Sequence, residues 1–160
     1  MRILEYPDPG LKLEARELDK ESVRHLRTLV RRMTRAMRDA PGIGLAATQV
    51  GVQERVIVYE IDDELTALVN PRIVYASDEC AVEEEGCLSF PGLVVPIERP
   101  VRVVCDGATA EGEPVRIEAD DLTARVIQHE IDHLDGVLII DRAEPDERKA
   151  ALKRYRQERL

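Results

Sequence analysis

The chain has 160 residues, of which 44% are hydrophobic, so it is long enough to form one domain with a sizeable core. No apolar run approaches the ~20 residues that a membrane-spanning helix needs, and residues 1–9 lack the basic and apolar regions of a secretory signal. Three cysteines argue against a disulfide framework, and the absence of tryptophan argues against an aromatic platform for single-stranded nucleic acid. We therefore expect one cytoplasmic domain over residues 1–160, without membrane association and with an unevenly distributed net charge of −9.

The first predicted element is an amphipathic helix over residues 20–39. Its arginines fall mostly on one side, and Pro41 ends it because proline cannot continue a helix. The other side carries apolar residues at helical spacing, namely Val23, Leu26, Leu29, Val30, Met33 and Met37. That side is expected to pack against the core.

A glycine-rich segment, residues 42–49, follows the helix. Its two glycines and Ala47 satisfy the pattern G-x-G-x-x-A, which marks a dinucleotide-binding turn only where a strand precedes it and a helix follows. Here a helix precedes it and a strand within residues 50–61 follows, so we expect a helix-to-strand loop instead. Gln49 ends this loop, where its amide can either donate to an oxyanion or satisfy loop backbone groups.

Several short strands are predicted in the middle of the chain, separated by Asn70-Pro71, Pro100 and glycine turns. They cover residues 65–69, 73–76, 93–97, 101–105 and 115–118. This order of helix, strands and helix predicts an α+β fold. We expect Cys80 and Cys105 to be small buried side chains, and the first two residues of the acidic run at 83–85 to be solvated.

The most informative motif is H-E-x-x-H, formed by His129, Glu130 and His133. Two imidazoles four residues apart share one face of a helix and can bind one divalent ion, with the glutamate beside them to transfer protons. Asp120 or Asp121 would cap the start of the helix. The end would be capped by Gly136, and the stripe of Leu122, Val126, His129 and His133 would face inward. The alternative is a pair of ordinary histidines, yet the chain has three His in all.

A catalytic metal needs a third protein ligand and an open position for water. The extended zinc-protease motif would place it at residue 139, but Ile139 cannot bind a metal. Glu144, Glu147 and Glu158 lie in a charge-rich tail that is predicted to be solvated. Cys87 is the stronger candidate, because the neighbouring glycine permits a close backbone approach.

Three segments together carry a family resemblance: Gly42-Ile43-Gly44-Leu45-Ala46-Ala47-Thr48-Gln49, Glu85-Gly86-Cys87-Leu88-Ser89 and Gln128-His129-Glu130-Ile131-Asp132-His133. They resemble the three signature motifs of the peptide deformylases, in the same order, and the opening residues 3–9 are also similar to that family. The resemblance implies an α+β fold in which antiparallel or mixed sheets pack around a central helix that carries H-E-x-x-H. It also implies that Cys87, His129 and His133 bind the metal and that Glu130 is the general acid and base.

The resemblance implies an enzyme that removes the formyl group from the N-formylmethionine of newly made polypeptides and releases formate. Glu130 would take a proton from the attacking water, while Gln49 and the backbone N–H of Leu88 would donate to the oxyanion. The family favours Fe(II) in the cell, although a thiolate and two imidazoles also suit Zn, Ni or Co. A general metallopeptidase and a non-enzymatic metal-binding module are the alternative functions.

The substrate would be bound by residues beside the three motifs, with an apolar pocket for the methionine side chain. The candidates are Ile43, Gly44, Gly86, Leu122 and Val126. One position departs from the family, because many members have an arginine where this chain has Val94. Contacts with the residues that follow the formylmethionine are therefore expected to differ.

The C-terminal segment, about residues 144–160, is predicted to be a basic helix. Between residues 148 and 159 it has six basic side chains against one acidic side chain, Glu158, so its local net charge is +5. One interpretation is the solvated face of a packed helix. The other is a contact with ribosomal RNA near the site where nascent chains emerge.

Overall fold

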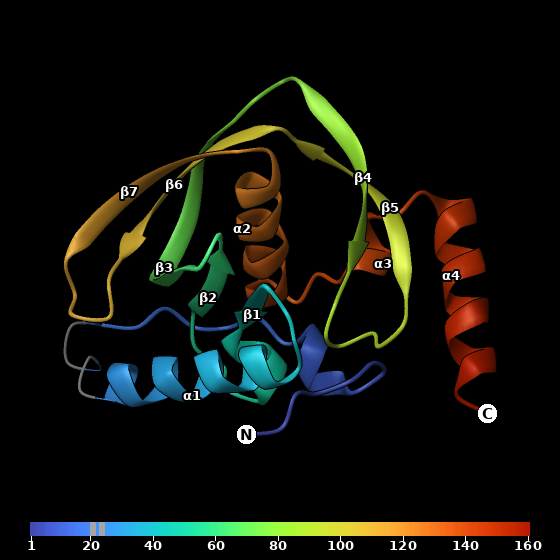
Figure 1. Ribbon diagram of the computed structural model, residues 1–160, viewed down its shortest axis with the longest axis horizontal. Coiled ribbons are helices and arrows are strands. Elements are labelled where there is room, and N and C mark those ends of the chain that lie inside the picture. The colour runs from blue at the N-terminus through green and yellow to red at the C-terminus, as the bar shows by residue number, and fades with distance from the viewer. Residues whose placement is uncertain (20–21, 23–24) are drawn as a thin grey trace.

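The computed structural model describes residues 1–19, 22 and 25–160, and Figure 1 shows its arrangement. Helix α2 (Asp121–Leu134) occupies the centre. A five-stranded sheet lies on one side of it and the two-stranded sheet of β4 (Cys80–Gly86) and β5 (Val94–Pro100) lies on the other. The predicted α+β fold with a central motif-bearing helix is therefore confirmed.

The five-stranded sheet has the order β1-β2-β3-β6-β7, and all neighbouring strands are antiparallel. Its strands are β1 (Gly44–Ala46), β2 (Val56–Ile61), β3 (Glu64–Ala76), β6 (Arg102–Ala108) and β7 (Pro114–Asp120). Alternate residues of these strands face α2, as the two-residue repeat of a strand requires. They form a core with the apolar face of the helix that includes Ile57, Leu68, Val103, Cys105, Ile127 and Leu134.

Strand β3 differs from the sequence prediction, which placed a turn at Asn70-Pro71. The strand runs through this pair for 13 residues, and its pairing with β6 shifts register between Val69 and Arg72. Asn70 takes a φ of 50° and its side chain exchanges two hydrogen bonds with the backbone of Leu18. The residues that usually break a strand here form a bulge, where the missing N–H of proline is tolerated.

The β4–β5 sheet was only half predicted, because β4 was not expected as a strand. Its run of three glutamates resembles a solvated segment, and much of the strand is indeed exposed. Cys80, at its start, is exposed, so the expectation that it is buried was wrong; Cys105 is buried as expected. Against α3 (Ile139–Arg142) and α4 (Pro145–Glu158), β5 buries Val95 and Ile97.

Helix α1 (Leu26–Asp39) covers the lower end of the molecule in Figure 1 and buries Leu26, Leu29, Met33 and Met37. The predicted helix began at residue 20, but residues 20–21 and 23–24 lie outside the described residues. Short 3-10 helices occupy Pro9–Lys12 (η1) and Ala47–Val50 (η3), the latter inside the predicted glycine loop. Among the helices that the structure describes, none is long and apolar enough to cross a membrane.

The ends of α2 were predicted in position but not in detail. Asp120 stands at the N-cap, yet its carboxylate accepts a hydrogen bond from Arg102 (2.7 Å) and makes no cap hydrogen bond. Asp121 begins the helix with a φ of 49°. Gly136 directly follows the C-cap residue with a φ of 73°, the left-handed conformation that ends many helices.

Candidate metal centre

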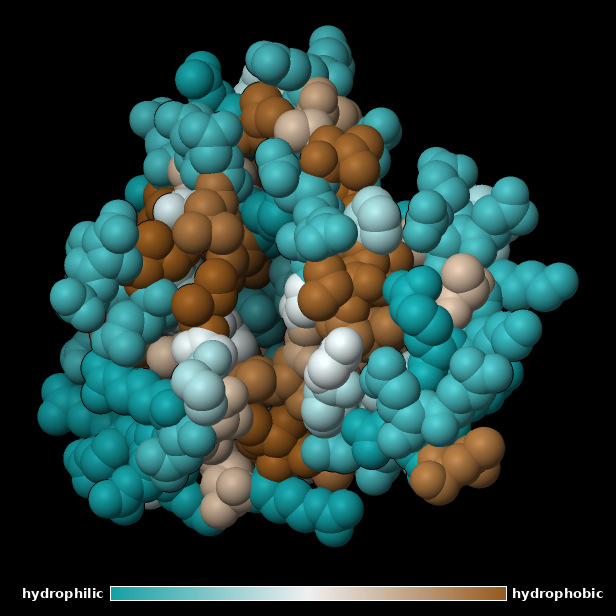
Figure 2. Space-filling model, turned by 45° about the vertical axis from the view of Figure 1, so that its right-hand side comes forward, coloured by the Kyte–Doolittle hydropathy of each residue, from teal (hydrophilic) through white to brown (hydrophobic). Residues whose placement is uncertain are grey.

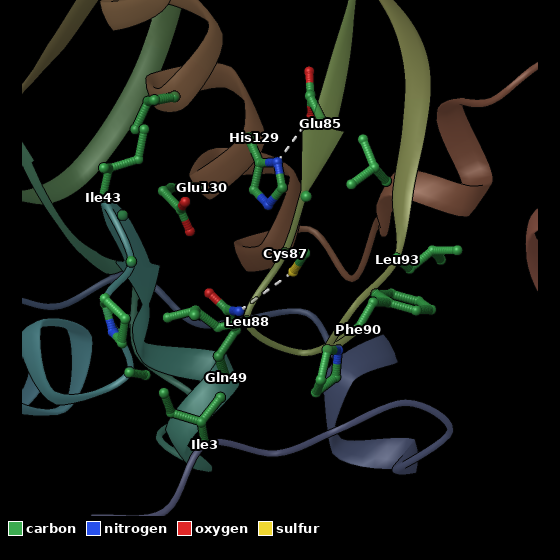
Figure 3. A pocket seen from close by; sticks show the side chains of 18 of the residues that line it. Ile3, Ile43, Gln49, Glu85, Cys87, Leu88, Phe90, Leu93, His129 and Glu130 are labelled. Atoms are coloured by element: carbon green, nitrogen blue, oxygen red, sulfur yellow. Dashed lines mark hydrogen bonds and ion pairs between the residues drawn. The ribbon is translucent and has the colours of Figure 1, made fainter. Parts of the chain in front are cut away.

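Three side chains from two elements converge beside α2. Cys87 directly follows β4, whereas His129 and His133 project from one face of α2, one turn apart. One ligand atom from each residue lies within 4.8 Å of the others, and Cys87 Sγ is 3.3 Å from His133 Nε2. The cluster is therefore built by the packing of the β4–β5 sheet against α2, and Figure 3 shows Cys87 and His129 facing the same space.

The donor set fits one divalent transition metal, since thiolate sulfur and imidazole nitrogen are its usual ligands. His129 Nδ1 is 2.9 Å from Glu85 Oε1, which leaves the other ring nitrogen available to an ion. His133 Nδ1 is buried and has no hydrogen-bond partner among the described residues. These contacts do not select one metal over another.

The electrostatics of the two imidazoles differ. Burial lowers the pKa of His133 well below its usual value, so its ring is neutral, as metal binding requires. Burial also opposes charge on His129, but Glu130, Cys87 and Glu85 outweigh this effect and raise its pKa well above the usual value. The surroundings of His129 therefore favour positive charge, which a bound cation would provide.

Glu130 lies beside the cluster in a position suited to proton transfer. Its Oε1 is buried without a hydrogen-bond partner among the described residues. Burial, reinforced by Glu85 and Asp132 and opposed by His129, raises the pKa of Glu130 to about 7. A carboxyl group with a pKa near 7 can both accept and release a proton at neutral pH. The space around it is tight, since a Cβ atom at Gly44 would be 2.5 Å from Glu130 Oε2.

Gln49 presents its amide nitrogen to the same cluster. Its Oε1 accepts a hydrogen bond from the backbone N–H of Ala46 at 2.9 Å, which fixes the orientation of the amide. Its Nε2 then lies 3.0 Å from Ser89 Oγ and 3.6 Å from Cys87 Sγ. Leu88, the other predicted oxyanion residue, is half-buried and lines the same cleft.

A cleft of about 950 Å³ leads to these residues, and Figure 2 shows a hollow with hydrophobic residues on both sides. All five predicted substrate-binding residues line it: Ile43, Gly44, Gly86, Leu122 and Val126. Ile43 and Leu122 are about half exposed, at 48% and 53%, so they lie near the open mouth of the cleft. Val94 also lines the cleft and is 46% exposed.

Glu85 is a site residue that sequence reasoning missed. It was placed in an acidic run, but it is 5% exposed and pairs with His129, Arg99 and Arg125. Burial alone would raise its pKa, yet hydrogen bonds from His129 and Arg99 outweigh burial and lower the pKa to about 2. Its place two residues before Cys87 was the one available signal.

The other ligand candidates lie elsewhere. Glu144, Glu147 and Glu158 are exposed on or beside α4 and do not belong to the cluster. Ile139 is a buried core residue, in keeping with the rejection of the extended protease motif.

Comparisons with known proteins agree with this geometry. A family model described as polypeptide deformylase matches residues 1–149. The chain is 47% identical over 155 residues to the peptide deformylase of Acidothermus cellulolyticus, which covers 95% of this chain and 83% of the relative. With that of Natranaerobius thermophilus the identity is 49% over 138 residues, covering 86% of this chain and 88% of the relative.

Two solved structures extend the agreement to three dimensions. The peptide deformylase from Thermus thermophilus matches with a TM-score of 0.91 at 36% identity, over 98% of this chain and 93% of that one. That from Synechococcus elongatus, solved in complex with actinonin, matches with a TM-score of 0.90 at 37% identity, over 96% of this chain and 86% of that one. Because sequence and fold both match along nearly its whole length, this chain belongs to the peptide deformylase family.

Proposed function

We propose that this chain hydrolyses the formyl amide of N-formylmethionyl nascent peptides with Glu130 as its general acid and base and with one divalent ion on Cys87, His129 and His133. Deformylation is the activity of the family. The observation that carries the residue assignment is the clustering of three metal-binding side chains, two of which line the cleft together with a buried carboxyl group whose pKa is about 7.

A bound divalent ion supplies Lewis-acid chemistry, since it lowers the pKa of water and polarises a carbonyl oxygen. Glu130 accepts a proton from the attacking water and later returns it to the leaving amine, so formate and a free amino terminus result. Gln49 Nε2 and the backbone N–H of Leu88 donate to the oxygen of the formyl group as negative charge develops on it. Each such donor contributes on the order of 3 kcal/mol in enzymes of known mechanism.

The metal in the cell is proposed to be Fe(II), with Zn, Ni or Co as substitutes. A thiolate and two imidazoles bind all four ions, so the choice of Fe(II) rests on the metal that the family resemblance favours. Iron beside a thiolate makes the site sensitive to oxygen. Protein purified anaerobically is expected to lose activity in air faster than its nickel-loaded form, and equal rates of loss would contradict the iron assignment.

One assay separates deformylation from the two alternative functions. We expect formate release from formyl-Met-Ala-Ser, and its loss in Glu130→Ala with metal content unchanged, because the acid and base is removed while all three ligands remain. Unformylated Met-Ala-Ser is the control substrate. Cleavage between residues of unformylated peptides would indicate a general metallopeptidase, and metal binding without formate release in the unmodified protein would indicate a binding module.

A ribosome contact through α4, in the cytoplasm where nascent chains emerge, is proposed as well. The helix docks through the buried Ala151 and Tyr155, which leaves Lys149, Lys153 and Arg156 exposed. Phosphate contacts of such side chains weaken as salt concentration rises.

The charge reversal Lys153→Glu with Arg154→Glu is expected to weaken co-sedimentation with ribosomes at low salt and to leave turnover of a free formyl-tripeptide unchanged. The matched control is Arg31→Glu with Arg35→Glu, which reverses two exposed charges on α1. Equal binding by both double variants would contradict a contact through α4.

A further inference from the structure

A row of charged side chains, buried except at its far end, extends from the metal cluster to the opposite side of α2. It begins at Glu85, which contacts His129, and continues through Arg99 and Asp132 to Arg142. Figure 3 shows its first link, the contact between Glu85 and His129. At the far end, Arg99, Asp132 and Arg142 line a second cleft of about 450 Å³, so the row connects the two faces of the helix.

Arg99 is the member of this row that joins two carboxylates. It is 4% exposed, and its Nε and Nη2 donate to the two oxygens of Glu85 at 2.5 and 3.0 Å. Its Nη1 donates to Asp132 Oδ2 at 2.9 Å. Arg125 adds a further hydrogen bond to Glu85 at 2.6 Å. Only a planar guanidinium offers several donors in this fixed arrangement, and the single ammonium of lysine does not.

The two carboxylates belong to the two elements that position the metal ligands. Glu85 is in β4, two residues before Cys87, whereas Asp132 precedes His133 in α2. A thiolate and two imidazoles bind one ion only if β4 and α2 keep a fixed separation, because metal–ligand distances vary by a few tenths of an ångström at most. Arg99 spans this separation without being one of the ligands.

Stability alone is a weak reason for burying these charges. The cost of removing ions from water often exceeds their mutual attraction, so that apolar side chains of similar size can replace buried pairs without loss. Metal binding offers a stronger reason. Removing a hydrogen bond that orients a metal ligand typically lowers metal affinity 10- to 100-fold.

We propose that Arg99 is a positioning residue. It holds Cys87, which directly follows β4, and the two histidines of α2 at the separation that one metal ion requires. The inference rests on the proposed function, because it takes Cys87, His129 and His133 as the ligands. It concerns the supporting side chain and adds no residue to the reaction itself.

The test compares the unmodified protein with Arg99→Lys and Arg99→Met. Zn(II) affinity is measured by competition with a chelator, and the visible spectrum of the Co(II)-loaded protein reports the coordination geometry. We expect about a 10- to 100-fold loss of Zn(II) affinity and a changed Co(II) spectrum in both variants. Arg142→Met is the matched control, since Arg142 binds the same Asp132 but is half exposed and does not contact Glu85. It should keep both properties.

Thermal unfolding of the metal-free proteins shows whether Arg99 acts only on the stability of the fold. Variants of Arg99 that unfold at lower temperature but keep the affinity and the Co(II) spectrum would overturn the proposal. If both variants fail to fold, Asp132→Asn releases the same guanidinium from the α2 side and is subject to the same expectation and the same refutation. An unmodified protein that binds no Zn(II) would refute the metal site itself, which is a different failure.

Discussion

Gln49 shows how hydrogen bonds hold a buried side-chain amide in one orientation. The amide oxygen is occupied by the backbone N–H of Ala46, so the amide cannot rotate without losing a buried hydrogen bond. The nitrogen is thereby directed toward Ser89 and Cys87 before any substrate arrives. Such fixed donors stabilise charge that develops in a transition state, because no reorganisation is needed.

We therefore predict that Gln49→Leu lowers kcat for a formyl-tripeptide by about 100-fold and leaves metal content unchanged. Steady-state kinetics and metal analysis on the same sample provide the measurement. Gln157→Leu, which changes an exposed glutamine of α4, is the control. A variant of Gln49 that loses metal or melts early, with normal kcat in the remaining folded fraction, would assign the side chain a structural role.

The cysteines give a second prediction at this scale. Burial raises the pKa of the Cys105 thiol from 9.0 to about 11, whereas Cys80 is exposed. Because the folded-state pKa is raised, the stability that protonated Cys105 contributes is complete below about pH 9 and is lost as the pH rises through 11. Iodoacetamide at pH 8.5 should therefore label Cys80 and spare Cys105, as peptide mass spectrometry would show. Equal labelling in the folded protein would contradict the burial of Cys105.

Sequence reasoning brought together most residues of the site, because the three motifs name side chains whose chemistry is distinctive. It set Glu85 apart from Glu83 and Glu84, which were expected to be solvated, but gave it no role, because its contacts with α2 depend on how β4 pairs and packs. The same limit explains Cys80. The face that a strand residue takes depends on tertiary contacts, which a short strand without regular alternation does not reveal.

At the level of elements, turn residues were the least reliable guide. Asn70-Pro71 was interpreted as a break, yet the chain continues through it as a bulged β3, because Asn70 bonds to Leu18 from a distant segment. Helices α1 and α2 were easier to predict, since their apolar faces repeat over several turns. An apolar pattern that repeats over several turns thus predicts a helix reliably, whereas a single pair of turn-forming residues does not reliably predict the end of a strand.

The C-terminal end of α2 provides a prediction about stability. At Gly136, φ is 73° and an added Cβ would be 2.4 Å from the backbone oxygen of Lys12. Gly112 has a similar φ of 87°, but an added Cβ there meets no atom within 4 Å. Gly112→Ala therefore isolates the cost of the left-handed backbone, roughly 1–3 kcal/mol, and Gly136→Ala should exceed it because of the clash.

Urea denaturation of the two glycine variants measures this difference directly. Gly136→Ala should have the lower midpoint at an unchanged slope. Equal midpoints would mean that the Lys12 segment moves away at little cost, and that η1 is only loosely held against the end of α2.

On the scale of the whole molecule, the charge is divided between a basic α4 and an acidic cleft. The rim of the cleft includes the exposed carboxylates of Asp39 and Glu84, together with that of Glu5, which pairs with Arg159. Among the described residues that line the cleft, Arg125 is the one arginine or lysine, and Glu85 already binds it. Val94, which also lines the cleft, supplies no charge.

This distribution predicts a preference among substrates. Formyl-Met-Ala-Lys should have a kcat/KM roughly 2- to 5-fold higher than formyl-Met-Ala-Glu at low salt, the scale of partly exposed charge interactions. Salt should reduce the difference because it screens exposed charges. Val94→Arg should also reduce the difference in kcat/KM between the two peptides. Val82→Arg, which adds the same charge at an exposed position of β4, should reduce this difference less. Equal values for the two peptides at low salt would contradict the electrostatic argument.

The aromatic residues of this chain are few, yet three of them lie together. Tyr6, Phe90 and Tyr155 have ring centroids 4.9 to 5.9 Å apart, and the hydroxyl of Tyr155 donates to the backbone oxygen of Tyr6. The cluster joins the N-terminal segment, the turn after Cys87 and helix α4. The chain has no tryptophan and four tyrosines, so its ultraviolet fluorescence comes from tyrosine. Two of these four tyrosines lie in the aromatic cluster. The protein thus contains an intrinsic optical reporter of whether α4 is docked.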